Sequence, residues 1–341
     1  MFKISFGSDN HSGIHPQVLD AITQANNGYC AAYGDDPLTL EVLRSIETLF
    51  GGDCEAWFVM TGTGANVLSL QSLMQSFHAV ICASTSHINV DECGAVQKFT
   101  QARLSPIDTP DGKLTPQLIA PRLLGDRDQH HSQFKIISIS QSTEYGTLYS
   151  LEELKALADF AHAHKMLLHI DGARLANAAV ALDCTMQQMT KDVGADIVSF
   201  GGTKNGMLFG EAIISFRPEL TLDMRFFRKQ ATQLFSKMRF IAAQFQAYLQ
   251  DDLWKSNATH ANQMSKLLAS RLAELPQINI TQKVYVNALF AILPPHLIAP
   301  LQEKYLFYTW NEALNEVRLM CSFNTREEHI EEFIRTLKSM L

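Results

Sequence analysis

Two apolar segments of the sequence end in residues that can carry out chemistry. Residues 166–170 run into Asp171-Gly-Ala-Arg174, and residues 196–200 run into two glycines followed by Thr203 and Lys204. In open α/β sheets, ligands collect at the carboxyl ends of the strands, so both Asp171 and Lys204 are placed to meet a ligand. A lysine that is partly desolvated near other cations loses its proton readily and becomes a nucleophile towards an aldehyde.

A third segment suits a single phosphate group. Thr61-Gly-Thr-Gly-Ala-Asn66 follows the apolar residues 57–60 and opens a helical pattern that continues to Phe77. Small residues at this point let backbone N–H groups approach an anion at the helix N-terminus. The third glycine of a dinucleotide fingerprint and the lysine of a phosphate loop are both missing. The segment therefore predicts one phosphate rather than a dinucleotide, and argues against a nucleotide-binding module.

Together the three segments predict a site for pyridoxal 5'-phosphate (PLP). The phosphate is expected on the turn 61–66, and Asp171 beside the pyridine nitrogen, which an opposite charge keeps protonated. A protonated ring is an electron sink for a carbanion at the α-carbon of a substrate. Lys204 is expected to hold the cofactor as a Schiff base. Each segment alone has a plainer interpretation: a turn-capping aspartate, a solvated loop lysine, and a small-residue turn before a helix.

The elements around these segments alternate between strands and helices. Five short apolar runs predict buried strands, at residues 79–82, 135–139, 166–170, 196–200 and 212–216. Between two of them, Ser150 and Glu153 form a capping box that opens a helix with apolar positions 154, 157, 158 and 161. This rhythm predicts an α/β fold with a largely parallel sheet.

The second half of the chain predicts a smaller domain. A helix is expected over about 229–249, and a hinge over 251–257. The expected elements beyond the hinge are a helix (about 260–275), strands near 284–293 and 317–323, and a last helix capped by Thr325 with Glu328. We therefore predict a large PLP-binding domain, residues 1–250, and a small C-terminal α/β domain, residues 251–341.

The composition excludes several classes of protein. The chain has 341 residues, 46% of them hydrophobic, and a formal net charge of −7. No dense Lys/Arg run suggests nucleic-acid binding, and no apolar run approaches the ~18 residues of a membrane span. The start, Met1 to Gly7, lacks the apolar core of a secretion signal. The six cysteines show no CxxC or zinc-type spacing, which predicts no metal site and buried free thiols in the cytoplasm; a catalytic cysteine is the disfavoured alternative.

With these motifs in hand, the sequence resembles the threonine aldolase branch of the fold-type-I PLP enzymes, in the β-eliminating lyase superfamily. The Asp-Gly-Ala-Arg-Leu stretch with its downstream Thr-Lys is the specific part. The matching segments keep the family order and span nearly the whole chain: Ser8-Asp9-Asn10, Tyr33 to Pro37, Thr61 to Asn66, Ser86-His87, Asp91-Glu92, Asp171 to Ala178, Thr203-Lys204, Met238-Arg239 and Val317-Arg318-Leu319. The resemblance implies a mainly parallel, seven-stranded sheet in the large domain.

The resemblance also implies roles for single residues. Around the cofactor, Thr61, Gly62 and Thr63 are expected at the phosphate, His87 stacked over the pyridine ring and Arg174 near the phenolic oxygen. Arg239 of a neighbouring subunit is expected to reach the phosphate.

The substrate is expected to be held mainly by Arg318. Its fork of N–H donors suits a carboxylate better than an ammonium does. Ser8 is expected to help hold the same carboxylate, and Tyr33 to approach the site of a partner subunit. The resemblance further implies a homotetramer built of dimers, with active sites shared between subunits.

The activity that the resemblance implies is retro-aldol cleavage of a β-hydroxy-α-amino acid. L-Threonine, L-allo-threonine or a 3-phenylserine would yield glycine and an aldehyde. A general base must take the β-hydroxyl proton. The resemblance points to a histidine just before the strand at Lys135, here His130 or His131, with His130 preferred, and His87 as the alternative. β-Elimination, transamination, or a PLP-binding protein without turnover are the other hypotheses on the same scaffold.

Four segments depart from the commoner family pattern. Much of the family has Ser-Asp-Thr, Glu-Asn-Thr-His-Asn, Ser-Lys-Gly-Leu and Gly-Gly-Gly-Met-Arg-Gln. This chain has Ser8-Asp9-Asn10, Gln141-Ser-Thr-Glu144, Thr203-Lys-Asn-Gly206 and Leu234-Phe-Ser-Lys-Met-Arg239. These segments resemble a side branch that includes phenylserine aldolase and low-specificity L-threonine aldolase. They leave open the preferred aldehyde side chain, and whether Lys237 and Arg228 share in phosphate binding.

Overall fold

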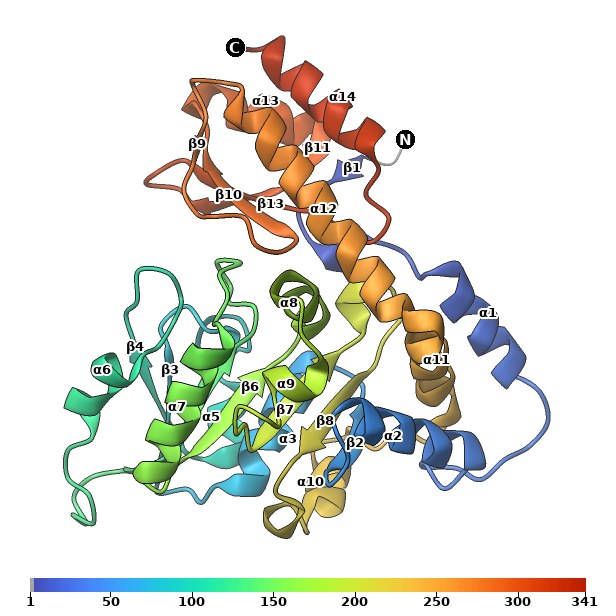
Figure 1. Cartoon of the computed structure of the whole chain (residues 1–341), viewed down its shortest axis with the longest axis vertical. Coiled ribbons are helices and arrows are strands. Elements are labelled where there is room, and N and C mark those ends of the chain that lie inside the picture. Colours follow the sequence, from blue (N-terminus) through green and yellow to red (C-terminus); the bar gives the residue numbers. More distant parts are fainter. Residues whose placement is uncertain (1–2) are drawn as a thin grey trace.

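A seven-stranded sheet forms the centre of the computed structural model, which describes residues 3–341 (Figure 1). Its strand order is β2-β8-β7-β6-β5-β3-β4. β4, β3, β5, β6 and β7 run parallel, and β8 lies antiparallel between β7 and β2. The strands are β2 (Glu55–Val59), β3 (His78–Ala83), β4 (Arg103–Ile107), β5 (Gln133–Ser140), β6 (Leu167–Asp171), β7 (Ile197–Gly201) and β8 (Glu211–Ser215). The predicted α/β fold class is confirmed.

Helices cover both faces of this sheet, which explains why its central strands read as continuous apolar runs. Every residue of β6 and β7 is buried. One face packs against α3 (Gly62–Leu73), α5 (Ala95–Thr100) and α10 (Met224–Gln230). The helices on the other face are α2 (Pro37–Leu49), α6 (Pro116–Ile119), α7 (Leu151–Ala163), α8 (Leu175–Leu182), α9 (Met186–Met189) and α11 (Arg239–Leu249), and α1 (Pro16–Ala25) packs on α11.

Local capping signals start two of these helices. The predicted capping box is present at α7, where the Ser150 side chain accepts from the N–H of Glu153 and Glu153 accepts from the N–H of Ser150. At α2, Asp36 accepts from the N–H of Thr39 at 2.8 Å, and Pro37 occupies the first helical position. Asp36 and Pro37, which end the matched segment from Tyr33 to Pro37, thus have a structural role in starting α2.

The C-terminal part (residues 251–341) adds a second, antiparallel sheet of order β12-β13-β10-β9. The N-terminal strand β1 pairs with β11, and Phe6 packs against Phe333 with ring centroids 5.2 Å apart. Residues 4–6 therefore pack with the C-terminal part, so the division at residue 250 remains a prediction. The elements are β1 (Ile4–Ser5), α12 (Leu253–Ala273), β9 (Asn279–Ile280), β10 (Ala288–Ile292), α13 (Pro295–Lys304), β11 (Tyr305–Leu306), β12 (Tyr308–Asn311), β13 (Glu316–Met320) and α14 (Glu327–Lys338).

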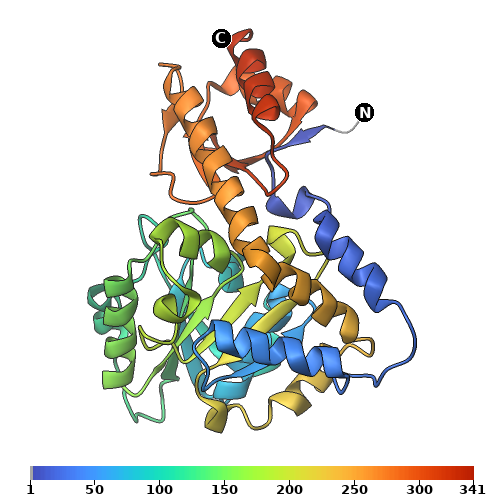
Figure 2. The ribbon, with the colours of Figure 1, turned by 45° about the vertical axis from the view of Figure 1, so that its right-hand side comes forward.

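The helix α12 joins the two parts of the chain (Figure 2). Its first turns pack on α8 and its last turns on α14. The predicted hinge over 251–257 is wrong for residues 253–257, because α12 already begins at Leu253. The break is confined to residues 250–252, where Asp251 and Asp252 adopt left-handed backbone angles.

Two helix predictions are wrong in detail. The expected helix over 229–249 is interrupted, because residues 231–238 separate α10 from α11 and Thr232 has a φ of 61°. There the side chain of Gln233 accepts a hydrogen bond from the N–H of Met60, so this loop stabilises the turn before α3. The last helix is capped at Arg326 rather than Thr325.

The six cysteines form no disulfide, but only Cys82 and Cys321 are buried, whereas Cys30 and Cys93 are exposed. The expectation of buried thiols is therefore wrong for those two, which lie in loops before α2 and α5. Across residues 3–341, no helix combines the length and the hydropathy that crossing a membrane requires.

Candidate active site

One pocket opens where four parallel strands and β2 end. α3 begins just after β2, His87 follows β3, Ser140 ends β5, Asp171 ends β6 and Lys204 follows β7. The residues that line the pocket are Gly62, Asn66, His87, Ser140, Ser142, Glu144, Asp171, Ala173, Arg174 and Lys204. The structure thus brings together Gly62 and four other predicted site residues, His87, Asp171, Arg174 and Lys204, because carboxyl ends of parallel strands share one edge of a sheet.

Asp171 is held as a carboxylate. Only 8% of its surface is exposed, its Oδ2 accepts from Asn66 Nδ2 at 2.8 Å, and its Oδ1 accepts from the N–H of Ala173 at 3.0 Å. Burial alone would raise the pKa of Asp171, but the hydrogen bond from Asn66 and the charge of Lys204 outweigh it. The pKa therefore lies below its ordinary value of 3.8, and Asp171 is anionic at neutral pH.

Lys204 lies in a short 3-10 turn, Thr203–Asn205, directly after β7. Burial lowers the pKa of Lys204 below its ordinary value of 10.5, and the charge of Arg174 acts in the same direction. The carboxylates of Asp9 and Asp171 oppose this shift but do not cancel it. A lysine with a lowered pKa reaches the neutral, nucleophilic amine more easily, which is the property predicted for this position.

A chain of hydrogen bonds links His87 to Asp171. His87 Nδ1 lies 2.8 Å from Glu92 Oε1, and Asn66 Nδ2 donates to that oxygen and to Asp171 at 2.8 Å each. The hydrogen bond with Glu92 raises the pKa of His87; burial opposes this shift, and the charge of Asp171 supports it. The Glu92 side chain is fully buried, so the network fixes the orientation of the imidazole.

The N-terminus of α3 has the features of an anion site. Thr61 is its N-cap, with the side chain accepting from the N–H of Gly64 at 3.0 Å. Because the first N–H groups of a helix have no partner inside it, those of Gly62 and Thr63 can bind a phosphate. A Cβ at Gly64 would lie 2.5 Å from the end of the Gln233 side chain, so a larger residue there would displace the side chain that accepts the N–H of Met60.

Arg228 and Lys237 are the two further cations that could bind the phosphate. Arg228 lies on α10, which packs against α3, and its Nε is buried without a hydrogen-bond partner among residues 3–341. Burial lowers the pKa of Arg228 to about 10, and its guanidinium lies 5.0 Å from the ring of Trp57. Lys237 is exposed in the loop before α11. Arg228 is thus the better placed of the two.

Arg174 is paired with Asp9, the first residue of the short 3-10 helix η1 (Asp9–His11) in the N-terminal segment. Arg174 Nε donates to Asp9 Oδ2 at 2.7 Å and Nη2 donates to Oδ1 at 3.0 Å, which makes a bidentate pair. Asn287 Nδ2 also donates to Asp9, at 3.1 Å. This pair ties the N-terminal segment and β10 of the C-terminal part to the edge of the central sheet.

We expect Asp9→Ala to lower the free energy of unfolding by about 3–5 kcal/mol, because it leaves the buried Arg174 without its counter-charge. Burial would raise the pKa of Asp9, but Arg174 and Lys204 hold it below 3.8. The stabilisation is therefore present above pH ~4 and lost as the pH falls through the lowered pKa. Urea unfolding at pH 7 measures the effect. Asp159→Ala, at an exposed ion pair, is the control and should change stability by under ~0.5 kcal/mol; equal values for the two variants would contradict the prediction.

Arg318 projects from β13 beside the pocket. One Nη donates to the carbonyl oxygen of Gly7 at 3.1 Å, and Nε is buried without a partner among residues 3–341. Its guanidinium lies 4.9 Å from the ring of Trp310 and 5.9 Å from that of Tyr308. Ser8 follows Gly7 and caps η1 through a hydrogen bond from Asn10. Nε is thus a buried donor without an acceptor, which marks the guanidinium as a candidate ligand for a carboxylate.

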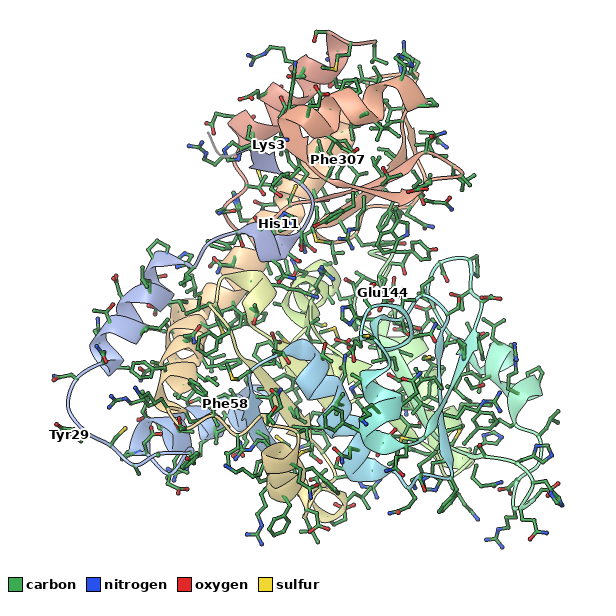
Figure 3. All side chains as sticks on the ribbon, turned by 180° about the vertical axis from the view of Figure 1, so that it is seen from behind. Lys3, His11, Tyr29, Phe58, Glu144 and Phe307 are labelled. Atoms are coloured by element: carbon green, nitrogen blue, oxygen red, sulfur yellow. The ribbon has the colours of Figure 1, made fainter. Side chains whose placement is uncertain are left out.

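Tyr33 and Arg239 do not line the pocket of their own chain. Arg239 begins α11 and donates to the carbonyl oxygen of Gly28, and Tyr33 is 47% exposed with a φ of 63°. Tyr33 belongs to the segment 26–36, and Arg239 contacts this segment at Gly28. Tyr29 of the same segment is fully exposed at the periphery of the molecule (Figure 3).

The predicted general bases His130 and His131 are not in the pocket either. Both are exposed in the loop before β5, whereas the pocket lies beyond its last residue, Ser140. β5 is eight residues long, so roughly 25 Å separates its two ends at ~3.3 Å per residue. Within one chain, the structure therefore does not support proton transfer by either histidine.

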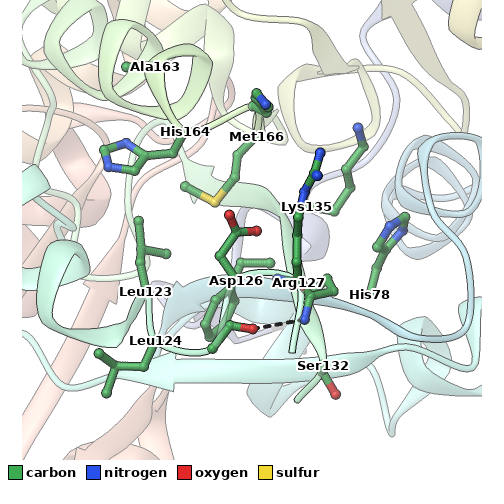
Figure 4. Close-up of a pocket in the computed structure, with 14 residues that line it drawn as sticks. His78, Leu123, Leu124, Asp126, Arg127, Ser132, Lys135, Ala163, His164 and Met166 are labelled. Atoms are coloured by element: carbon green, nitrogen blue, oxygen red, sulfur yellow. Dashed lines mark hydrogen bonds between the residues drawn. The ribbon is translucent and has the colours of Figure 1, made fainter. Parts of the chain in front are cut away.

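The loop before β5 borders a larger cavity of about 420 Å³ instead (Figure 4). His78, Asp126, Lys135 and Met166 line it, at the amino ends of β3, β5 and β6. This is the edge of the sheet opposite to Lys204. The cavity therefore lies away from the candidate active site.

Several residues of the site were missed as functional. The sequence analysis predicts no role for Asp9 and Glu92, which belong to motifs shared with the family. It also predicts no role for Glu144, which belongs to a segment that departs from the family pattern. Glu211, the first residue of β8, pairs in register with Gly201 close to Lys204, and burial raises the pKa of Glu211 to about 7. No sequence signal identified Glu211, because a single acid at the start of an apolar strand is common and its contacts come from the fold.

Comparisons of the sequence and of the structure with known proteins find the same family. Residues 5–294 match the family described as β-eliminating lyase. A "low specificity L-threonine aldolase" of Pseudomonas aeruginosa is 40% identical over 338 residues, covering 98% of this chain and 97% of that protein. A protein of the same name from Pseudomonas sp. (strain NCIMB 10558) is 39% identical with the same coverage. The solved structure of Leishmania major threonine aldolase superposes with a TM-score of 0.94 at 30% identity and covers 99% of both chains.

Proposed function

Because this chain belongs to the threonine aldolases of the β-eliminating lyase family, we propose that it cleaves L-threonine, L-allo-threonine or 3-phenylserine to glycine and an aldehyde. It is a PLP-dependent lyase. The observation that carries the proposal is that Lys204, Asp171 and His87 line one pocket at the ends of neighbouring strands. The alternatives of a nucleotide-binding module or a catalytic cysteine find no support in this pocket, which contains no cysteine.

The residues present fit PLP. Asp171 is a buried carboxylate for the pyridine nitrogen, Lys204 is an amine of lowered pKa for the aldehyde, and the N-terminus of α3 offers N–H groups for the phosphate. Arg174, still holding Asp9, borders the same pocket and is assigned to the phenolic oxygen. When bound, PLP supplies a protonated ring that accepts the electron pair released from the Cα–Cβ bond.

Arg318 and Ser8 are assigned to the carboxylate of the substrate. The unpartnered Nε of Arg318, next to an Nη held by Gly7, presents donors in a fixed plane. Holding the carboxylate sets the rotation about the bond between nitrogen and Cα, and therefore which bond at Cα stands perpendicular to the ring. That is a positioning effect, in which binding geometry selects the bond that breaks.

An aryl side chain on the substrate is supported by the aromatic residues around Arg318. The rings of Trp310, Phe290 and Tyr145 pack against one another, with centroids 5.4–6.1 Å apart, and the ring of Tyr308 lies 5.9 Å from the guanidinium. Tyr145 follows the pocket residue Glu144 directly in sequence. Edge-to-face packing with these rings would favour a phenyl group over a methyl group, which supports 3-phenylserine as a substrate.

The assembly that we propose is a homotetramer built of dimers. The exposed Tyr33 and the half-buried Arg239 have no role in the pocket of their own chain, and both could reach a second copy. In that copy, Arg239 would contact the phosphate and Tyr33 the substrate side. A cytoplasmic location is proposed on the ground that all six cysteines are unpaired.

A substrate panel tests the proposed activity. We expect purified protein supplied with PLP to cleave L-threonine, L-allo-threonine and 3-phenylserine, and to release one glycine and one aldehyde for each substrate molecule. The highest kcat/KM is expected for 3-phenylserine. Chromatography of the amino acids and a coupled aldehyde assay measure the two products. Release of a 2-oxo acid with ammonia, amino-group exchange with a keto acid, or no product at all would refute the aldolase assignment.

A further inference from the structure

Glu144 is a carboxyl group in the pocket that the assignments above leave without a role. It stands where the commoner family pattern has a histidine, and it lines the pocket. It lies on the side of the central-sheet part that is turned towards the C-terminal part (Figure 3). Its Oε1 accepts from Ser140 Oγ at 2.6 Å and from the N–H of His87 at 3.0 Å. Oε2 accepts no hydrogen bond from residues 3–341. It is also not one of the fully buried side-chain atoms that lack a hydrogen-bond partner, so it is accessible from the pocket. One oxygen is therefore anchored and the other is free to meet a ligand.

The surroundings of Glu144 make its carboxylate a stronger base than an exposed glutamate. Burial raises the pKa of Glu144 above its ordinary 4.5, the hydrogen bond from Ser140 opposes this shift, and the negative charge of Asp171 adds to it. Three positively charged or titrating groups share the pocket with it. His87, the first residue of α4 (His87–Val90), donates its N–H to Glu144, the charge of Glu144 raises the pKa of Arg174 after β6, and Lys204 follows β7. The thiol of Cys82 on β3 and the phenol of Tyr149 face it as well, and both keep their protons because burial raises their pKa values.

We propose that Glu144 takes the proton from the β-hydroxyl group of the substrate through Oε2. The O–H bond of the hydroxyl breaks, an O–H bond forms at Oε2, and the oxygen electrons form the aldehyde C=O as the Cα–Cβ bond breaks. The electron pair of that bond stays with Cα, which then takes up one proton as glycine forms. Glu144 returns its proton to water, so protons balance. The inference rests on the proposed aldolase function and assigns one residue within it.

The other candidate bases are less suited to this step. His87 shares its Nδ1 with the buried Glu92, and the resulting higher pKa favours the protonated imidazolium, which is a poor base. His130 and His131 lie at the opposite end of β5 and could act only in a different copy of the chain. Among residues 3–341, Glu144 alone combines a free oxygen, a place in the pocket and a raised pKa.

Glu144→Gln tests the inference, because glutamine keeps the size and the Oε1 acceptor but is no base. We expect kcat/KM for L-threonine to fall by ~10²–10⁴-fold, the usual contribution of a general base, and the acid limb of its pH profile to vanish. Glycine has no β-hydroxyl group. The exchange of its α-proton with D₂O, followed by NMR, should therefore stay within ~3-fold of the wild-type rate, as should the visible absorption of bound PLP.

A second variant separates proton transfer from a purely positioning role. Ser140→Ala removes a hydrogen bond that favours the carboxylate, so the pKa of Glu144 should rise and the acid limb of kcat/KM should move to higher pH. A parallel loss of cleavage and glycine exchange in Glu144→Gln would overturn the inference, and so would an acid limb that disappears in His130→Ala instead. If wild-type protein cleaves no β-hydroxy-amino acid, the proposed function itself fails, which is a different result from an active Glu144→Gln variant.

Discussion

Lys204→Ala is expected to lose the visible absorption of covalently held PLP and to lower kcat/KM by at least ~10³-fold, the scale on which enzymes lose activity when a covalent residue is removed. Lys204 is the pocket's one lysine, and its amine is made available by burial and by Arg174. After borohydride treatment and digestion of the wild-type protein, mass spectrometry should find the pyridoxyl group on the peptide spanning Ser199 to Gly210. Lys155→Ala, at an exposed pair with Asp159, serves as the matched control and should behave as wild type.

The Lys204→Ala protein should remain folded, so its inactivity can be interpreted. Because burial and the charge of Arg174 lower the pKa of Lys204, its charged form is disfavoured in the folded protein, and we expect its removal to cost little stability. Circular dichroism and a melting curve close to wild type check this expectation. Retention of the visible band in a folded Lys204→Ala protein, or a pyridoxyl group on a different peptide, would show that another residue holds the cofactor.

The parts of the site that the sequence predicted depend on local signals. A strand, a short turn and a functional residue lie within ten residues of each other at both Asp171 and Lys204, and the chemistry follows because parallel strands end at one edge. The capping box at Ser150 is equally local. For the same reason, the strand bounds predicted from apolar runs differ from those of the structure by only a few residues.

The parts that failed depend on contacts between distant segments. The apolar stripe around Leu234 and Met238 fits a helix, yet Gln233 leaves the helical path to accept the N–H of Met60, 173 residues away. Asp9 acquires its meaning only from Arg174, 165 residues further along the chain. The role predicted for His130 comes from the resemblance to the family. The sequence does not show whether His130 lies near the pocket of its own chain. Spacing alone does not encode such pairings.

The second large effect is expected at Asp171→Asn, because this variant keeps the size of the side chain and removes only the charge. Without the anion, the pyridine nitrogen loses its proton more easily and the ring withdraws electrons less strongly. We expect kcat/KM for L-threonine to fall by at least ~10²-fold, while Lys204 still holds the cofactor and the visible band persists. Asp159→Asn, at an exposed position, should change neither quantity.

The same variant makes a directional prediction about Glu144. The charge of Asp171 contributes to raising the pKa of Glu144, so its removal should lower that pKa and move the acid limb of the residual activity to lower pH. Ser140→Ala should move the limb in the opposite direction, since it removes a donor that favours the carboxylate. Opposite shifts from two neutral replacements on different strands are hard to obtain from a general loosening of the pocket. A limb that stays in place in both variants would mean that the titrating group is not Glu144, and full activity of Asp171→Asn would mean that Asp171 does not face the ring nitrogen.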